Sequence, residues 1–153
     1  MSNAFNSVIS QVVDLGIKAI ETSEQFNDAY DIIIKKTGAT GENLESFKES
    51  ANNVYSELPT SLEDSATAVG EVNTKFALTG EELEEVSKMF IQFATINDTD
   101  VNNSIDTISQ LMKQWNLNME NLPGLLGLIT SNAQATGISV DSLISGMCEL
   151  PII

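Results

Sequence analysis

The fold is decided by a five-residue phrase, Thr40-Gly41-Glu42-Asn43-Leu44, which returns later in the chain. It reappears as Thr79-Gly80-Glu81-Glu82-Leu83 and, more faintly, as Asn118-Met119-Glu120-Asn121-Leu122, with an offset of 39 residues each time. A fixed period of roughly 20–50 residues is typical of arrays of supersecondary units rather than of one irregular domain. The phrase therefore predicts a chain built from repeated helix pairs.

The same offset relates apolar residues on either side of the phrase. The equivalent positions are Leu62, Val101 and Val140; Val69 and Ile108; Val72 and Leu111; and Phe76 and Trp115. Within each unit the apolar residues recur at the three- and four-residue spacing that places them on one face of a helix. The sequence predicts core packing at five repeat positions: Leu44, Phe76, Leu83, Trp115 and Leu122.

Helix boundaries are marked by glycines and by short polar side chains. Glu82 follows Thr79 by three residues, the spacing of a capping box at the start of a helix. Asp100 and Ser139 precede apolar stripes and carry oxygens that can accept a hydrogen bond from the first helical turn. The predicted turn and cap residues are Thr40, Gly41, Thr79, Gly80, Glu82, Asp100, Gly137 and Ser139.

No segment shows the alternating pattern of a strand, so the sequence predicts an all-α fold, an antiparallel array of helix pairs that forms a helical bundle or a short α-solenoid. Turns of three to five residues should join antiparallel neighbours from about residue 5 to 149. The predicted parts are a leader at 1–22, helix pairs at 23–61, 62–100 and 101–139, and an interrupted fourth repeat at 140–153.

The fourth repeat has a first helix, from about residue 140 to 150, without the second helix of its own pair. Its apolar residues are Leu143, Ile144, Met147 and Leu150. Large apolar side chains left in water forfeit about 1.5–3 kcal/mol each. We therefore expect this helix to pack on a second copy of the chain, or on the N-terminal segment around Val8, Val12 and Leu15.

The composition disfavours several classes of function. The 153 residues include 22 acidic and 7 basic side chains, which give a formal charge of −15. Nucleic acids and anionic membranes are bound through Lys and Arg, so neither is an expected partner. No apolar run approaches the roughly 18 residues that span a bilayer. We expect neither a transmembrane segment nor a signal peptide.

The residue types that carry catalysis are scarce. The chain has no histidine, and Cys148 therefore lacks the usual base that activates a thiol. The stretch Asp98-Thr99-Asp100-Val101-Asn102 begins like a calcium loop, but Asn103 and Ser109 stand where that loop needs glycine and glutamate. We expect helix capping there, and no metal, cofactor or enzymatic activity.

Three longer segments stand in a characteristic order. They are Phe26-Asn27-Asp28-Ala29-Tyr30 with Thr37-Gly38-Ala39-Thr40-Gly41-Glu42-Asn43-Leu44; Val72-Asn73-Thr74-Lys75-Phe76-Ala77-Leu78-Thr79-Gly80-Glu81-Glu82-Leu83; and Ala133-Gln134-Ala135-Thr136-Gly137-Ile138-Ser139-Val140-Asp141. Together they resemble the N-terminal and core helical region of phage tail tape measure proteins. That family occupies the tail lumen, sets tail length during assembly and leaves during DNA ejection.

The resemblance implies a structural role in a phage or prophage tail. It implies self-association and contacts with tube, chaperone and baseplate proteins, in the virion tail lumen or in the host cytoplasm during assembly. A continuous helix of 153 residues would span about 230 Å. Breaks are predicted at 37–41, 58–60, 78–80, 97–100, 117–120 and 136–139. The resemblance therefore implies a fragment from a helical region of the family rather than its ruler portion.

Two other functions remain open. A helical-repeat adaptor would need a groove lined by matching side chains, but Asn73 and Lys75 align with Met112 and Gln114. A small secreted effector of the WxG class would need a glycine after its tryptophan, where Trp115-Asn116-Leu117 has none. Tail-tube, chaperone and baseplate genes beside this one would favour the phage interpretation.

Overall fold

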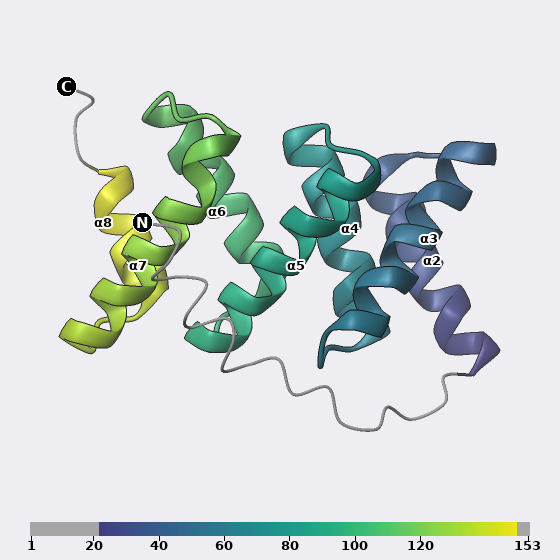
Figure 1. The fold of residues 1–153 in the computed structure, drawn as a ribbon, viewed down its shortest axis with the longest axis horizontal. Helices are drawn as coiled ribbons and strands as arrows, with labels where there is room; N and C mark the ends of the chain where they lie inside the picture. The colour runs from purple at the N-terminus through teal and green to yellow at the C-terminus, as the bar shows by residue number, and fades with distance from the viewer. Residues whose placement is uncertain (1–21, 150–153) are drawn as a thin grey trace. The chain divides into compact units, whose positions relative to one another are not determined.

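The computed structural model describes residues 22–149, which are all-helical and contain no strand (Figure 1). The elements are α2 (Ser23–Thr37), α3 (Gly41–Glu57), α4 (Leu62–Phe76), α5 (Gly80–Asn97), α6 (Val101–Gln114), the 3-10 helix η1 (Met119–Asn121), α7 (Leu122–Thr136) and α8 (Val140–Cys148). The predicted leader before residue 22, with Val8, Val12 and Leu15, lies outside the described residues, as does Leu150.

The helix boundaries confirm the 39-residue period. The first helices of successive pairs begin at Ser23, Leu62, Val101 and Val140, which are equally spaced. The second helices begin at Gly41 and Gly80, and the third member of that series begins with η1 at Met119 before it continues as α7. The predicted fold class, an array of helix pairs, is therefore confirmed.

Every first helix starts with the same hydrogen bond. A side-chain oxygen of the residue before the helix accepts from the backbone N–H of its third residue. The pairs are Thr22 with Gln25 (3.2 Å), Ser61 with Asp64 (3.0 Å), Asp100 with Asn103 (2.8 Å) and Ser139 with Ser142 (3.2 Å). Asp100 and Ser139 were predicted from sequence. Thr22 and Ser61 were missed, although counting back by the period from Asp100 reaches both.

The second helices start differently. Gly41 and Gly80 both have positive φ, 59° and 62°, a conformation that strains any residue with a Cβ. The carbonyls of Thr40 and Thr79 accept from backbone N–H groups four residues on, both at 3.4 Å. Thr40 occupies the cap position, but its side chain makes no capping bond. Glu82 is exposed in the first turn of α5, and its capping box stays a prediction.

The repeated phrase is altered at its third occurrence. Asn118 caps η1, since its side-chain oxygen accepts from the backbone N–H of Glu120 at 3.0 Å. The side chain of Asn121 accepts in return from the backbone N–H of Asn118, also at 3.0 Å. This reciprocal cap starts a 3-10 turn in place of an α-helix, so α7 begins three residues late in the repeat. Gly137 ends α7 as predicted, with its N–H donating to Ala133 at 2.9 Å.

The described residues fall into two compact units, one reaching to Ile91 and the other starting at Gln92. In the first unit, α2 and α3 both pack against α4. In the second unit, α6 and α7 both pack against α8. The relation is the same in each: both helices of one pair contact the first helix of the next pair. Within each unit, one helix pair is thus stacked on the first helix of the next pair, as in an α-solenoid.

The stacked first helices run parallel. At the C-terminal end of α2 and α4, the hydroxyl of Thr74 donates to the carbonyl of Lys36 at 2.8 Å. At their N-terminal end, Gln25 and Ser61 line one shared hollow. Contacts between α6 and α8 also join their first turns to each other and their last turns to each other. The chain reverses direction once between the two helices of a pair and once more before the next pair. Successive first helices therefore run in the same direction.

The predicted core positions are buried to different degrees. Leu83 and Leu122 are fully enclosed, as are the register positions Val69, Ile108, Val72 and Leu111. Leu44, Phe76 and Trp115 are only half-buried, so they lie at the margin of the core in which they were predicted to pack. Phe76 is the last residue of α4 and Trp115 immediately follows α6, so both rings lie at equivalent helix ends. Phe76 stacks on Phe90 with centroids 6.0 Å apart.

The last described helix has neighbours that the sequence reasoning did not foresee. α8 packs against α6 and α7, and its Val140 and Ile144 are buried there. The expected packing on a second copy stays a prediction, and the alternative partner around Val8, Val12 and Leu15 lies outside the described residues. Leu143 and Met147 on the same helix remain half-buried.

Replacing Ser61 by Ala should destabilise the unit that contains α4. Loss of the side-chain acceptor leaves the backbone N–H of Asp64 without its cap, at a cost of about 0.5–2 kcal/mol. Ser61→Asp keeps an acceptor, as Asp100 does in the next repeat, and should stay within about 0.5 kcal/mol of the parent chain. Urea unfolding followed by far-UV circular dichroism measures both; equal losses in the two variants would contradict the capping role.

Candidate functional site

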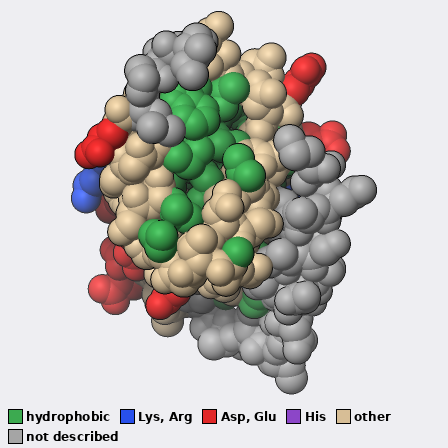
Figure 2. Space-filling model, turned by 90° about the vertical axis from the view of Figure 1, so that its left-hand side faces the viewer, with side chains coloured by type: hydrophobic (Ala, Val, Ile, Leu, Met, Phe, Trp, Pro, Cys, Tyr) green, Lys and Arg blue, Asp and Glu red, His purple; other side chains and the backbone are tan. Residues whose placement is uncertain are grey.

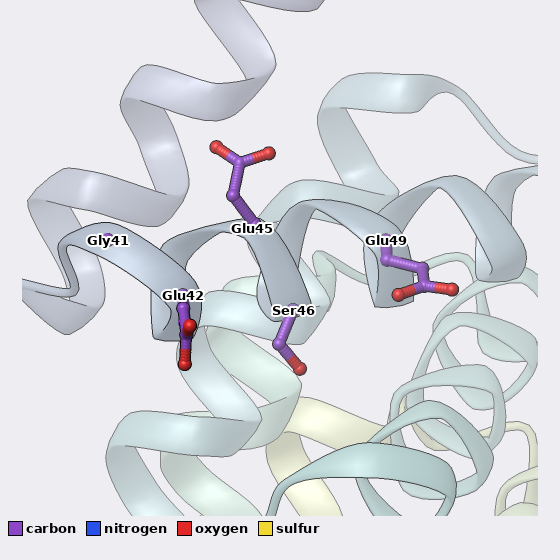
Figure 3. Close-up of a pocket in the computed structure, with 5 residues that line it drawn as sticks. All are labelled: Gly41, Glu42, Glu45, Ser46 and Glu49. Carbon is purple, nitrogen blue, oxygen red and sulfur yellow. The ribbon is translucent and has the colours of Figure 1, made fainter.

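A hollow of about 610 Å³ lies on the outer side of α3 and is lined by Gly41, Glu42, Glu45, Ser46 and Glu49 (Figure 3). The three carboxylates point in different directions, and Glu45 points away from Glu42. All five lining residues are exposed, and Glu45 already pairs with Lys48 at 2.9 Å. Carboxylates that diverge into solvent do not build a cation site, so this hollow is a shallow surface feature.

Other site chemistry is equally sparse in residues 22–149. No group of three or more Asp, Glu or Cys side chains is placed to hold a metal ion in this range. Cys148 is half-buried near the end of α8. Among the described helices, none combines the length and apolar character that crossing a membrane requires. The specific polar geometry of the molecule lies between its helices instead.

The closest approach of α2 to α4 is built around an ion pair. Lys36 on α2 donates to Glu71 on α4 at 3.0 Å, and Lys75 lies 3.8 Å from the other oxygen of that carboxylate. Gly70 makes room for the lysine, because a Cβ at this position would lie 3.0 Å from the Lys36 Cδ and 3.1 Å from its Cβ. Glu71 is nearly buried, and burial of a carboxylate requires such a partner.

A second lysine joins α5 to α3. Lys88 donates to Glu57 on α3 and to Glu85 on its own helix, both at 2.6 Å. Burial alone would lower the pKa of Lys88, but the hydrogen bonds and negative charges of the two carboxylates outweigh it and raise the pKa above 10.5. One helical turn earlier, Asn53 donates to Glu84 at 3.0 Å, so α3 and α5 are joined at two successive levels.

A third lysine joins α3 to α2. The ammonium of Lys48 lies 4.9 Å from the centroid of the Tyr30 ring, within the range of a cation–π interaction. The side-chain nitrogen of Asn52 donates to the Tyr30 hydroxyl at 3.1 Å. These contacts hold the antiparallel pair α2–α3 together. Lys36, Lys48 and Lys88 thus each bridge two helices, although lysines are scarce in this chain.

The second unit is joined by neutral donors instead. Asp141 in the first turn of α8 accepts from the Thr99 hydroxyl at 3.1 Å and from the Asn103 amide at 3.3 Å. At the other end of the same helices, the Gln114 amide donates to the backbone carbonyl of Cys148. α8 is therefore held to the start and the end of α6, beyond the apolar contacts of its buried face.

The structure places the sequence-predicted residues at helix boundaries and in the core, and it does not gather them into one site. The interhelical ion pairs were missed, because Lys36 and Glu71 lie 35 positions apart and neither belongs to the repeated phrase. A signal was nevertheless present in the sequence: Gly70 is a glycine inside a strongly helical stretch, which indicates close approach of another segment.

No protein-family model matches the chain, and neither does a curated protein or a solved structure. The family resemblance of the three sequence segments is therefore a hypothesis. The helix register and the contacts described above are the physical basis on which a function can be proposed.

Lys36 and Glu71 should be energetically coupled. A double-mutant cycle with Lys36→Met and Glu71→Gln is expected to give a coupling of about 1 kcal/mol, because the carboxylate is mostly shielded from water. The matched control is Lys48 with Glu45 on one helix, where Glu45 is largely exposed and the coupling should be about 0.3–0.5 kcal/mol. A smaller coupling for Lys36–Glu71 than for the control pair would contradict a stabilising role of this ion pair between α2 and α4.

The raised pKa of Lys88 predicts a loss of stability at alkaline pH. Because the folded state binds this proton more tightly, the contribution is complete below pH 10.5 and disappears as the pH rises through the higher folded pKa. The difference in unfolding free energy between the parent chain and Lys88→Met should therefore shrink as the pH rises above about 10.5. A difference that stays constant over this interval would show that the charge of Lys88 makes no contribution.

Proposed function

We propose that the chain is a structural module of a phage or prophage tail, a helical region of the tape measure type that acts during tail assembly in the tail lumen. The main support is that the segments carrying the family resemblance coincide with structured turns. Thr37-Gly38-Ala39 and Thr136-Gly137-Ile138 belong to two of these segments, and they end α2 and α7.

The two turns have the same hydrogen bonds. The hydroxyls of Thr37 and Thr136 donate to the carbonyls four residues earlier, at 2.8 and 2.6 Å. Each hydroxyl then accepts from the backbone N–H two residues later, from Ala39 at 3.1 Å and from Ile138 at 3.2 Å. The phrases that suggested the family are thus a structural element of the repeat. This agreement supports a shared helical architecture.

The charge is suited to a position beside DNA. With a formal charge of −15, the chain would be repelled by phosphates and would not adhere to the genome that passes through a tail. The lysines that bridge helices are, moreover, engaged with carboxylates or an aromatic ring of the same chain. We also propose a non-catalytic role, because the specific polar contacts join helices and do not converge on a pocket.

The adaptor alternative is favoured by the stacked helix pairs, since solenoids of this kind often bind peptides. The side chains at its expected groove positions are used inside the fold, however. Asn73 donates to the carbonyl of Leu78 at 2.9 Å, Lys75 lies 3.8 Å from Glu71, Met112 is buried, and Gln114 donates to Cys148. A peptide would have to displace these contacts, so the structural role is preferred.

Tail particles purified after prophage induction in the source strain would test the proposal. Peptides from residues 22–149 should be found by mass spectrometry in intact tails and should be depleted from tails that have ejected their DNA. The major tube protein is the internal control, because it remains in both preparations. Absence of the peptides from intact tails, together with their presence in the soluble cell fraction, would contradict the tail role and favour an adaptor.

A further inference from the structure

One face of α8, beside its buried residues Val140 and Ile144, is less covered than the equivalent faces of the earlier first helices. In α4 and α6, two register positions of this face are buried: Ser65 and Val69 in α4, and Ser104 and Ile108 in α6. The same positions in α8 are Leu143 and Met147, and both are only half-buried. The face that is an internal contact in the preceding repeats is therefore partly open in α8.

The open face extends beyond α8. Leu128 on α7 is 49% exposed, and Ile138 in the turn between α7 and α8 is 47% exposed. Figure 2 looks onto this end of the molecule and shows hydrophobic side chains gathered in one area, with charged side chains at its margins. We call this surface, made of Leu128, Ile138, Leu143 and Met147, the α7–α8 face.

The residue types on this face also differ between the repeats. Ser65 and Ser104 at the covered positions donate to the carbonyls of their own N-cap residues, at 2.9 and 2.7 Å. α8 instead carries Leu143 at the corresponding, more exposed position. A larger apolar residue at a less covered site indicates a surface that is buried by a partner.

The charge distribution points to the identity of the partner. Two chains of charge −15 repel each other over most of their surfaces. α7 contains no charged side chain, and the only one in α8 is Asp141, which is bonded to Thr99 and Asn103. The α7–α8 face is therefore an area where two copies of this chain can meet without opposing carboxylates.

The outer side of α2 excludes a head-to-tail arrangement. Glu24, Asp28, Asp31 and Lys35 are exposed along one face of that helix, at a spacing of three or four residues. If the α7–α8 face of one copy packed on α2 of the next, carboxylates would be buried against Leu128 and Met147 without partners, which is costly. Like-to-like packing avoids this cost and closes the assembly at two copies.

We propose that the α7–α8 face binds the same face of a second copy of this chain, forming a two-fold symmetric dimer. The inference rests on the helix register and the surface chemistry, and it does not depend on the proposed tail function. Leu128, Leu143 and Met147 contribute the apolar centre of the interface. Added salt should strengthen the dimer, because it screens the repulsion between the two acidic chains.

Sedimentation velocity and light scattering over a concentration series, at low and high salt, test the proposal. The full chain should reach twice its mass of 16.5 kDa and no more. Leu128→Glu and Leu143→Glu should each raise the dimer dissociation constant at least about tenfold, since each places charges opposite one another in an apolar contact. Ile34→Glu is the matched control, because Ile34 is 40% exposed on α2, outside the proposed interface.

Circular dichroism verifies that each variant keeps its helical content, and Leu128→Glu is the safer of the two because half of its side chain is already in water. A chain that stays monomeric at every concentration would overturn the proposal. So would a mass that keeps growing with concentration, which indicates head-to-tail assembly, or a control variant that weakens association as much as Leu128→Glu.

Discussion

One hydrogen bond, repeated every 39 residues, fixes where the first helix of each pair begins. Thr22, Ser61, Asp100 and Ser139 supply it with three different side-chain types, so the oxygen acceptor is kept while the residue varies. Because a cap satisfies a backbone donor that has no partner within the helix, it sets the helix start to a single residue. The apolar stripe then faces the same direction in each repeat, and the stacking of one pair on the next depends on that phase.

Stacking brings the first helices into direct contact, and the two units stabilise that contact with different chemistry. In the first unit, Gly70 lets α2 approach α4 and an ion pair between Lys36 and Glu71 forms at this point. In the second unit, Asp141 and Gln114 hold α8 to α6 through neutral donors and a backbone acceptor. A strongly acidic chain thus uses its few lysines to join helices. The surface that is left nearly free of charge, along α7 and α8, is the one on which another copy can pack.

Sequence periodicity predicted the fold class, the turns and the register, because helix phase and capping are local properties that a period preserves. It did not predict the burial of Phe76 and Trp115, since coverage at a helix end depends on neighbours that are distant in sequence. Nor did it predict that α8 packs on α6 and α7 of the preceding pair. The Lys36–Glu71 contact could not be predicted either, because a lysine can be matched to its carboxylate only after the two helices have been placed.

The 39-residue register is tested most directly by pairs of spin labels at the third residue of successive first helices. Cys148 is first replaced by serine, the residue found at the equivalent position 109, so that only the introduced cysteines are labelled. One pair, at residues 25 and 64, lies in the first unit; the other, at residues 103 and 142, lies in the second. Adjacent packed helices have axes about 8–10 Å apart, so both pairs should give one narrow distance distribution with the same maximum by electron double resonance. Clearly different maxima, or a broad distribution for either pair, would contradict a common stacking of the first helices.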